Sequence, residues 1–262
     1  MKLLLLYEYP QNMGSTSMQG TLLHRGLLEN GVECFPCHYE DRAKERDWFL
    51  KTHTADAVIG LGWWVDTPRI VNGPKQFGHT PVPWLLADGW VANYHETLSS
   101  LPLVFTTSQW VIDTYKRDGV DTKNFEVLHV GFDANLFRPL PKTHPGVAEV
   151  RRMFGVRDDE KMILTVGGDV TSKGAQEVLR GLKRMGTNVP RWKYVCKATD
   201  SDCAREHHQE ELKLIAELGL NPDQIIYAED EFSHNFMPYL LNAADVYAAP
   251  SRLEGFGMIQ LE

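Results

Sequence analysis

The sequence has 262 residues, 43% of them hydrophobic and 24% charged, which is the composition of an ordinary globular protein and excludes a disordered or collagen-like chain. Its 27 Lys and Arg against 35 Asp and Glu give a formal charge of -8, so we expect no nucleic-acid partner. At roughly 100 to 200 residues per domain, the length predicts two domains.

The first residues, from Met1 to Glu8, begin like a secretory signal peptide. The apolar run stops at Glu8 and no small-residue cleavage site follows, so we interpret it as a buried first strand. The sequence contains no run of the ~18 apolar residues that a membrane span needs, and its four cysteines are too few for a disulfide scaffold. We therefore expect a cytoplasmic protein without a transmembrane segment.

Short apolar runs alternate with helical patterns along the chain, which is typical of βαβ units around a parallel sheet. In the first half the predicted strands are 2–7, 32–35, 57–59, 82–86, 104–106 and 126–128, with helices such as 17–30 between them. In the second half we predict strands 162–166, 192–197, 225–227 and 246–248, and helices 147–154, 173–185, 204–218, 233–243 and one from about 256. The alternation predicts an α/β fold of two Rossmann-like domains with parallel sheets.

The stretch 137–145 contains Pro139, Pro141 and Pro145, which favour an extended linker over a helix or central strand. We therefore place an N-terminal, acceptor-side domain at residues 1–140 and a C-terminal donor domain at 146–262. The last predicted helix meets no stop signal before Glu262, which predicts that the second domain is incomplete and C-terminally truncated.

The segment 244–262 consists of a short strand, a proline, a glycine-containing turn and the start of a helix. Gly255 and Gly257 allow a ligand to approach the backbone, and the free amides of a helix N-terminus attract an anion such as a diphosphate. Glu254 and Glu262 can both face the crevice beyond the strand ends, where open α/β sheets bind ligands. We predict a phosphate-binding turn with one glutamate at a sugar and the other at a ribose.

A Pro-Ser dipeptide, then a glutamate, seven residues and a second glutamate, with Gly-Phe-Gly between them, resembles the donor-site motif of glycosyltransferase family 4. These retaining enzymes of glycosyl transferases group 1 have the GT-B fold. The resemblance implies that Glu254 contacts the donor sugar and Glu262 the ribose hydroxyls, while the amides of Gly257 and Met258 meet the phosphates. The donor-binding turn that it implies comprises Arg252, Gly255, Phe256, Gly257, Met258 and Glu262. A helix-capping turn with two solvated glutamates is the alternative.

Residues 163–174 resemble the strand and loop with which the family supplies an arginine and a lysine to the diphosphate. Lys173 matches the lysine, which implies a catalytic role for it beside Glu254. Gly168 stands where the arginine is expected, so one of two cations that stabilise developing charge is missing, unless Arg252 or Lys197 replaces it. An ordinary lysine in the first turn of a helix is the alternative for Lys173.

Two segments of the first half carry weaker matches. Residues 127–139 resemble the family's connection between its domains. After the first strand the family has a glycine-rich loop at the donor phosphate, of which only Gly14 is present here, and Ser15, Thr16 or Ser17 would cap the following helix without any ligand. Asp88 falls where relatives place a histidine and an acid; the histidine is missing, and Asp88 remains an acceptor-side candidate.

The resemblance implies a retaining glycosyltransferase that moves a sugar from a nucleotide-diphosphate sugar to a carbohydrate, lipid-linked or small-molecule acceptor. It requires no metal, no other cofactor and no protein nucleophile, because the enzyme acts by positioning and electrostatic stabilisation. A non-catalytic sugar-nucleotide-binding protein of the same fold is an alternative, suggested by Gly168 and Ala87. A dinucleotide-dependent oxidoreductase is disfavoured because no G-x-G-x-x-G motif opens a helix after either first strand.

Several further residue types could carry chemistry. Cys34 and Cys37 have metal-ligand spacing but lack a second pair, so we interpret them as structural, and we interpret the Asp200–Asp202 acid pair as part of a polar loop. Two neighbouring histidines are expected on the exposed face of a helix: His207 and His208. Four tryptophans could stack on an acceptor sugar, although we favour core packing: Trp63, Trp64, Trp84 and Trp90.

Overall fold

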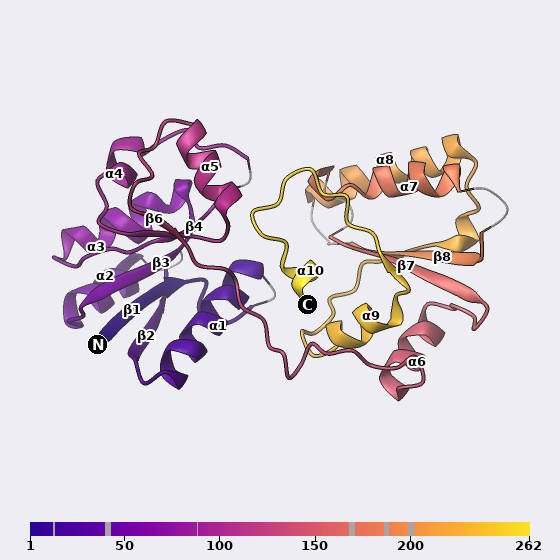
Figure 1. Cartoon of the computed structure of the whole chain (residues 1–262), viewed down its shortest axis with the longest axis horizontal. Helices are drawn as coiled ribbons and strands as arrows, with labels where there is room; N and C mark the ends of the chain where they lie inside the picture. The colour runs from indigo at the N-terminus through magenta and orange to yellow at the C-terminus, as the bar shows by residue number, and fades with distance from the viewer. Residues whose placement is uncertain (13, 40–42, 88, 168–170, 186–188, 199–201) are drawn as a thin grey trace. The chain divides into compact units, whose positions relative to one another are not determined.

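The computed structural model describes residues 1–12, 14–39, 43–87, 89–167, 171–185, 189–198 and 202–262 (Figure 1). The chain divides into two compact units. The first unit comprises residues 1–133 together with 254–261, and the second comprises residues 134–253 together with Glu262. The two units are described separately below.

The first unit is built on a six-stranded parallel sheet with the order β2-β1-β3-β4-β5-β6. Its strands are β1 (Lys2–Tyr7), β2 (Glu33–His38), β3 (Ala57–Trp63), β4 (Trp84–Leu86), β5 (Val104–Thr106) and β6 (Phe125–Val127). Its helices are α1 (Ser15–Glu29), α2 (Ala43–Thr52), α3 (Gly73–Gln76), α4 (His95–Ser99), α5 (Gln109–Arg117) and α10 (Met258–Leu261). A 3-10 turn η1 (Trp64–Asp66) and a π-helical turn η2 (Pro68–Asn72) follow β3.

Strand β1 lies between β2 and β3 in this sheet and is buried on both faces. Leu4 and Leu6 pack into one hydrophobic cluster with side chains from α2, α4 and α5, while Leu3 and Leu5 pack into another on the α1 side. This alternation is the two-residue period of a strand covered by helices on both faces. Helix α1 approaches β1 so closely that a Cβ atom on Gly20 would lie 2.2 Å from the ring of Tyr7. Only glycine fits at this contact.

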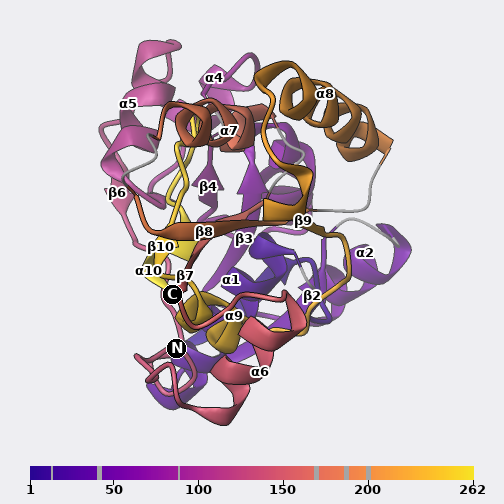
Figure 2. The ribbon, with the colours of Figure 1, turned by 90° about the vertical axis from the view of Figure 1, so that its right-hand side faces the viewer.

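The second unit has a four-stranded parallel sheet with the order β10-β7-β8-β9. Its strands are β7 (Glu160–Val166), β8 (Arg191–Lys197), β9 (Ile225–Ala228) and β10 (Val246–Tyr247). Its helices are α6 (Pro145–Met153), α7 (Ala175–Arg184), α8 (Asp202–Leu218) and α9 (Met237–Ala243), with 3-10 turns η3 (Thr171–Lys173) and η4 (Pro222–Gln224). Figure 2 shows α7 and α8 on one face of this sheet and α6 and α9 on the other.

The structure confirms the predicted α/β fold with parallel sheets, and the strands at 2–7 and 104–106 have the predicted bounds. Three helix starts were predicted too early. The helix expected from residue 173 begins at Ala175, because Gly174 adopts a left-handed φ of 80° that separates it from η3. The helix expected at 233–243 begins at Met237, and the one expected from about 256 begins at Met258. The predicted linker 137–145 lies in the second unit, and its last residue, Pro145, is the first of α6. The division of the domains there stays a prediction.

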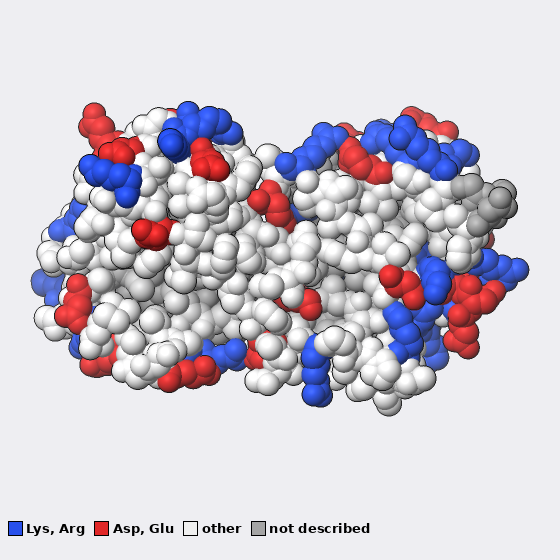
Figure 3. Space-filling model, in the orientation of Figure 1, with Lys and Arg blue, Asp and Glu red and all other residues white. Residues whose placement is uncertain are grey.

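On the face that Figure 3 shows, basic and acidic side chains lie near one another, and wide areas between them are uncharged. Over the ranges described above, no helix combines the length and apolarity that would be needed to cross a bilayer.

Candidate functional site

The predicted donor-site residues are divided between the two units. Lys173, Arg252 and Glu262 belong to the second unit, whereas the turn from Glu254 to Met258 belongs to the first. Gly168 and Asp88 lie outside the described residues.

In the second unit, Lys173 lies at the carboxyl edge of the sheet, beside the end of β7. Gly167 follows β7 directly, has a left-handed φ of 86°, and donates its backbone N–H to the carbonyl oxygen of Lys197 at 2.9 Å. A Cβ atom on Gly167 would lie 3.4 Å from Cγ of Lys173, so the lysine stem passes over this glycine. The two parts of the predicted phosphate-binding loop are therefore together at the edge where open α/β sheets bind ligands.

The segment that follows β10 packs against the turn that carries Lys173. A Cβ atom on Gly174 would lie 2.4 Å from the carbonyl oxygen of Pro250, which no side chain could tolerate without a backbone shift. The backbone N–H of Arg252 donates to the carbonyl oxygen of Ser172 at 2.8 Å. Strands β7 and β10 are parallel neighbours, so two motifs about 80 residues apart in sequence meet at one edge. The segment 163–174 and the start of the segment 244–262 therefore lie side by side in the second unit.

The guanidinium of Arg252 is engaged by an acidic partner. It donates a hydrogen bond to the carboxylate of Glu177 on α7. Burial acts to raise the pKa of Glu177, but the hydrogen bond and charge of Arg252 leave that pKa below its usual value. The arrangement holds the carboxylate ionised, and it directs Arg252 to α7 rather than leaving it as an unpaired substitute for the missing arginine.

Lys197, the other predicted substitute, ends β8 at the same edge of the sheet. Burial lowers the pKa of its ammonium group, and the charges of Glu231 and Asp230 act in the opposite direction. Its Nζ donates to the carbonyl oxygen of Ala198 and lies 5.7 Å from the centroid of the Phe232 ring. Lys197 is thus held by its own strand end and by an aromatic face.

Glu262, the predicted ribose ligand, is half-buried in the second unit. Burial raises the pKa of its carboxyl group to about 7. The group therefore changes charge near neutral pH.

In the first unit, the Gly255–Gly257 turn packs against the start of α5. The carbonyl oxygen of Gly255 accepts hydrogen bonds from Ser108 Oγ at 2.7 Å and Thr107 Oγ1 at 3.2 Å. The Phe256 ring lies 5.6 Å from that of His129. Sequence reasoning missed Thr107 and Ser108, although two hydroxyl residues directly after β5 at the carboxyl edge were a usable signal. Helix α10, whose N-terminus was predicted to attract an anion, has only 4 residues.

The loop around Gly14 is organised differently from the prediction. Gly14 is the N-cap of α1, and no side chain caps that helix end. Thr16 Oγ1 instead donates to the Glu8 carboxylate at 2.9 Å, and Ser17 Oγ donates to the Glu8 carbonyl oxygen at 2.7 Å. The expectation of a hydroxyl cap is wrong because the hydroxyls of Thr16 and Ser17 bind Glu8, the residue after β1.

The two cysteines with metal-ligand spacing lie on β2. Burial raises the pKa of both thiols, Cys34 and Cys37, to about 11, so both are protonated at neutral pH. Within the described ranges no group of three or more His, Cys, Asp or Glu is placed to hold a metal ion. Asp200 lies outside those ranges, and Asp202 is the first residue of α8 rather than part of a loop.

The aromatic candidates separate into buried and exposed groups. His208 is half-buried and packs edge-on against Tyr227 with 4.5 Å between ring centroids, and His207 is half-buried too. The expectation of an exposed helix face is wrong for His208, because its ring packs against Tyr227 on β9. Trp84 is in the core, as predicted, and donates its Nε1–H to the carbonyl oxygen of Leu128 at 3.0 Å. Trp90, in contrast, is exposed.

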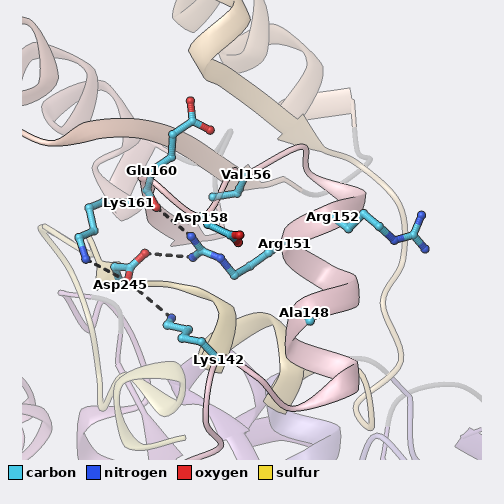
Figure 4. Close-up of a pocket in the computed structure, with 9 residues that line it drawn as sticks. All are labelled: Lys142, Ala148, Arg151, Arg152, Val156, Asp158, Glu160, Lys161 and Asp245. Carbon is cyan, nitrogen blue, oxygen red and sulfur yellow. Dashed lines mark hydrogen bonds and ion pairs between the residues drawn. The ribbon is translucent and has the colours of Figure 1, made fainter.

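A hollow of about 430 Å³ lies at the amino end of the second sheet (Figure 4). Lys142 Nζ donates to the carbonyl oxygens of Asn242, Ala243 and Ala244 at 2.6 to 2.9 Å, which caps α9. Arg151 donates to the carboxylate of Asp245 at 3.0 Å and to the carbonyl oxygens of Ala243 and Glu160. These charges are used to join α6, α9 and the starts of β7 and β10, so this end of the sheet is a structural clamp.

The fold and the sequence were compared with known proteins. Residues 147–262 match the family described as glycosyl transferases group 1. The D-inositol 3-phosphate glycosyltransferases of Mycobacterium bovis and Mycobacterium tuberculosis are 25% identical to this chain over 160 residues, or 61% of its length. The alignment spans 31% of those relatives, less than two thirds of their length.

Among solved structures, Anabaena HepE in complex with UDP and glucose matches 99% of this chain and 77% of its own, with a TM-score of 0.71 and 16% identity. Sucrose-phosphate synthase from Thermosynechococcus elongatus matches 99% of this chain and 78% of its own, with a TM-score of 0.74 and 15% identity. These neighbours show that the fold is GT-B. Residues 147–262 are thus similar to a family of glycosyl transferases, within a chain that has the fold of these neighbours.

Proposed function

We propose that this chain supplies the donor-binding and acceptor-binding residues of a retaining glycosyltransferase of family 4. Its donor is a nucleotide-diphosphate sugar, and its acceptor is a carbohydrate, a lipid-linked sugar or a small molecule. The observation that carries the proposal is the packing of the Gly167–Lys173 loop against the Pro250–Arg252 segment, directly before the motif that begins at Glu254. UDP-sugars are the first donors to test, because the structural neighbour HepE was solved with UDP.

The proposed chemistry assigns each motif one task. Lys173 and the backbone amides at Gly257 and Met258 bind the diphosphate, Glu254 orients the sugar, and Glu262 binds the ribose. The bond between the sugar and the phosphate oxygen breaks, and the acceptor oxygen bonds to the same face of the sugar. The acceptor proton passes to the departing diphosphate. The protein contributes position and electrostatic stabilisation, so the proposal requires no protein nucleophile, metal or other cofactor. We propose the cytoplasm as its location.

The variant Glu254→Ala tests this assignment. We expect it to retain nucleotide binding and to lose sugar transfer by about 100-fold or more, the range found when one group that stabilises a transition state is removed. Transfer is measured as release of free nucleotide diphosphate together with formation of the glycosylated acceptor. Glu149→Ala is the matched control, because Glu149 is an exposed glutamate on α6 that pairs with the exposed Arg152. Undiminished transfer by Glu254→Ala would contradict the proposal.

A second function is supported by the pairing of Arg252 with Glu177 and by the glycine at position 168. Because the expected arginine is absent and both candidate substitutes, Arg252 and Lys197, are engaged elsewhere, we expect weaker stabilisation of the leaving group. A sugar-nucleotide-binding protein without transfer activity would bind the donor and release no nucleotide product with any acceptor. The same assay therefore separates the two functions.

A further inference from the structure

We propose that Trp64 and Trp90 of the first unit form a platform on which a pyranose ring of the acceptor stacks. The inference rests on the proposed sugar transfer and specifies how the acceptor is recognised. It is carried by the position, the exposure and the fixed backbone of the two indoles.

The two tryptophans follow neighbouring strands at the same edge of the sheet. Trp64 comes directly after the last residue of β3, and Trp90 comes four residues after the last residue of β4. These strands are parallel, and their last residues, Trp63 and Leu86, are partners in register. Ligands of open α/β sheets bind outside the carboxyl ends of the strands, which is where both indoles lie.

The indoles form an open corner. Their ring centroids are 5.1 Å apart and their planes are inclined by 60°. Trp64 is half-buried and packs against the hydrophobic core, whereas Trp90 is 59% exposed. Core packing therefore accounts for Trp64 but not for Trp90, whose large apolar surface is held against another indole and still faces solvent.

The backbone on both sides of Trp90 is fixed by the end of α5. The carbonyl oxygen of Gly89 accepts a hydrogen bond from the guanidinium of Arg117 at 2.5 Å, and the N–H of Val91 donates to the carboxylate of Asp118 at 2.7 Å. Arg117 and Asp118 also bond to each other at 2.7 Å. A backbone held this way presents the exposed indole in one place, so little conformational entropy is lost when a ligand binds.

The segment after Trp64 is fixed as well. The N–H of Trp63 donates to the buried Asp66 carboxylate at 2.9 Å, and Asp66 also accepts from Arg69 at 3.1 Å. A pyranose ring has an apolar face of C–H bonds that can lie on the electron-rich face of an indole, and hydroxyls around its rim that can bond to polar neighbours. The aromatic corner matches the apolar face of that ring.

The test is a titration read at the indole Nε1–H signals of the seven tryptophans in a ¹H–¹⁵N NMR spectrum, with methyl α-D-glucopyranoside as the probe. We expect the Trp64 and Trp90 signals, assigned from single variants, to shift together along one saturable curve. Trp48 is the internal control, because it lies on α2 and is 64% exposed. Trp90→Ala is expected to weaken the binding seen at Trp64 by about tenfold, roughly 1.4 kcal/mol, whereas Trp48→Ala leaves it unchanged.

Three results would overturn the platform. The first is the absence of a saturable shift at Trp64 and Trp90 up to about 100 mM probe, two decades above a weak dissociation constant of roughly 1 mM. The second is an equal shift at Trp48. The third is a stronger response to cyclohexanol than to the glycoside, which would indicate a purely apolar site. Binding of UDP-glucose is measured in parallel by calorimetry. If UDP-glucose does not bind although the indole signals shift, the proposed sugar transfer is contradicted and the platform is not. If UDP-glucose binds and the indole signals do not shift, only the platform is contradicted.

Discussion

The two sheets have the same parallel construction, yet their carboxyl edges carry different side chains. The edge of the first sheet carries an indole corner at Trp64 and Trp90, and the hydroxyls of Thr107 and Ser108 there are bonded to the Gly255 carbonyl oxygen. The edge of the second sheet has Gly167 beside the stem of Lys173. Aromatic faces suit a sugar, whereas close backbone and a cation suit a diphosphate. The comparison indicates that the loops after the strands, not the shared scaffold, distinguish the two edges.

The two ends of the second sheet differ as strongly. At the amino end, Lys142, Arg151 and Asp245 are tied to backbone groups and to one another (Figure 4). At the carboxyl end, the half-buried Gly167 lies beside the stem of Lys173, and Gly174 packs closely against Pro250. We therefore expect substitutions at the carboxyl end to impair nucleotide binding, and those at the amino end to impair stability.

The largest effect on nucleotide binding is expected from Gly174→Ala. Its Cβ atom would lie 2.4 Å from the Pro250 carbonyl oxygen at a φ of 80°, so the turn and the segment after β10 must separate. Left-handed backbone alone costs roughly 1–2 kcal/mol for a residue with a Cβ atom, and we expect the affinity for a nucleotide sugar to fall about tenfold or more. Isothermal calorimetry measures this change.

Gly181→Ala is the matched control for that experiment. Gly181 lies within α7, and a Cβ atom there would meet nothing within 4 Å. Alanine should leave the affinity unchanged and stabilise the helix by about 0.5–1 kcal/mol. Equal affinities for the two alanine variants would show that the packing of Gly174 does not shape the donor site.

A second prediction concerns the amino end of the sheet. The variant Asp245→Ala removes the acceptor for the Met162 amide and the partner of the half-buried Arg151. We expect a loss of about 2–3 kcal/mol in the free energy of unfolding, because two hydrogen bonds to a charged group are lost. Urea denaturation measures it, and nucleotide affinity should not change. Asp159→Ala, which breaks an exposed pair with Arg191, should cost under about 1 kcal/mol. Similar losses for both variants would contradict the clamp.

The smallest effect is a pH dependence from the same carboxylate. Burial acts to raise the pKa of Asp245, but the Met162 amide, Arg151 and Lys142 together hold that pKa below its usual value. The folded protein therefore binds this proton more weakly than the unfolded chain, and the stability that Asp245 contributes is lost as the pH falls through its folded pKa. Urea midpoints of the unsubstituted chain and of Asp245→Asn should converge between about pH 5 and pH 2. A constant difference over that range would count against the assignment.

Much of the fold could be predicted because short segments of the sequence show the apolar pattern of the elements that they form. The leucine run of β1 and the apolar segment of β7 identified central strands, and the glycine-rich turns identified the donor motif. Pairings between distant residues could not be read in this way. Glu177 and Arg252, or Lys142 and Asp245, meet only because β7 and β10 are neighbours in the folded sheet.

The exposure of individual side chains was the other property that local sequence patterns could not predict. Trp84 and Trp90 have the same side chain six residues apart, yet Trp84 ends in the core and Trp90 in solvent. The difference arises because β4 ends at Leu86, after which the chain leaves the sheet and is held by Arg117 and Asp118. Neither the composition of the sequence nor the spacing of its residues indicates those contacts.

The most direct test of the central claim is a titration of the protein with UDP-, GDP- and ADP-sugars, following binding by calorimetry and release of the nucleotide by chromatography. The account predicts saturable binding of at least one of the three, weakened about tenfold or more by Lys173→Ala, because the lysine would neutralise charge on the diphosphate. Failure to bind any of them, or binding that Lys173→Ala leaves unchanged, would contradict it.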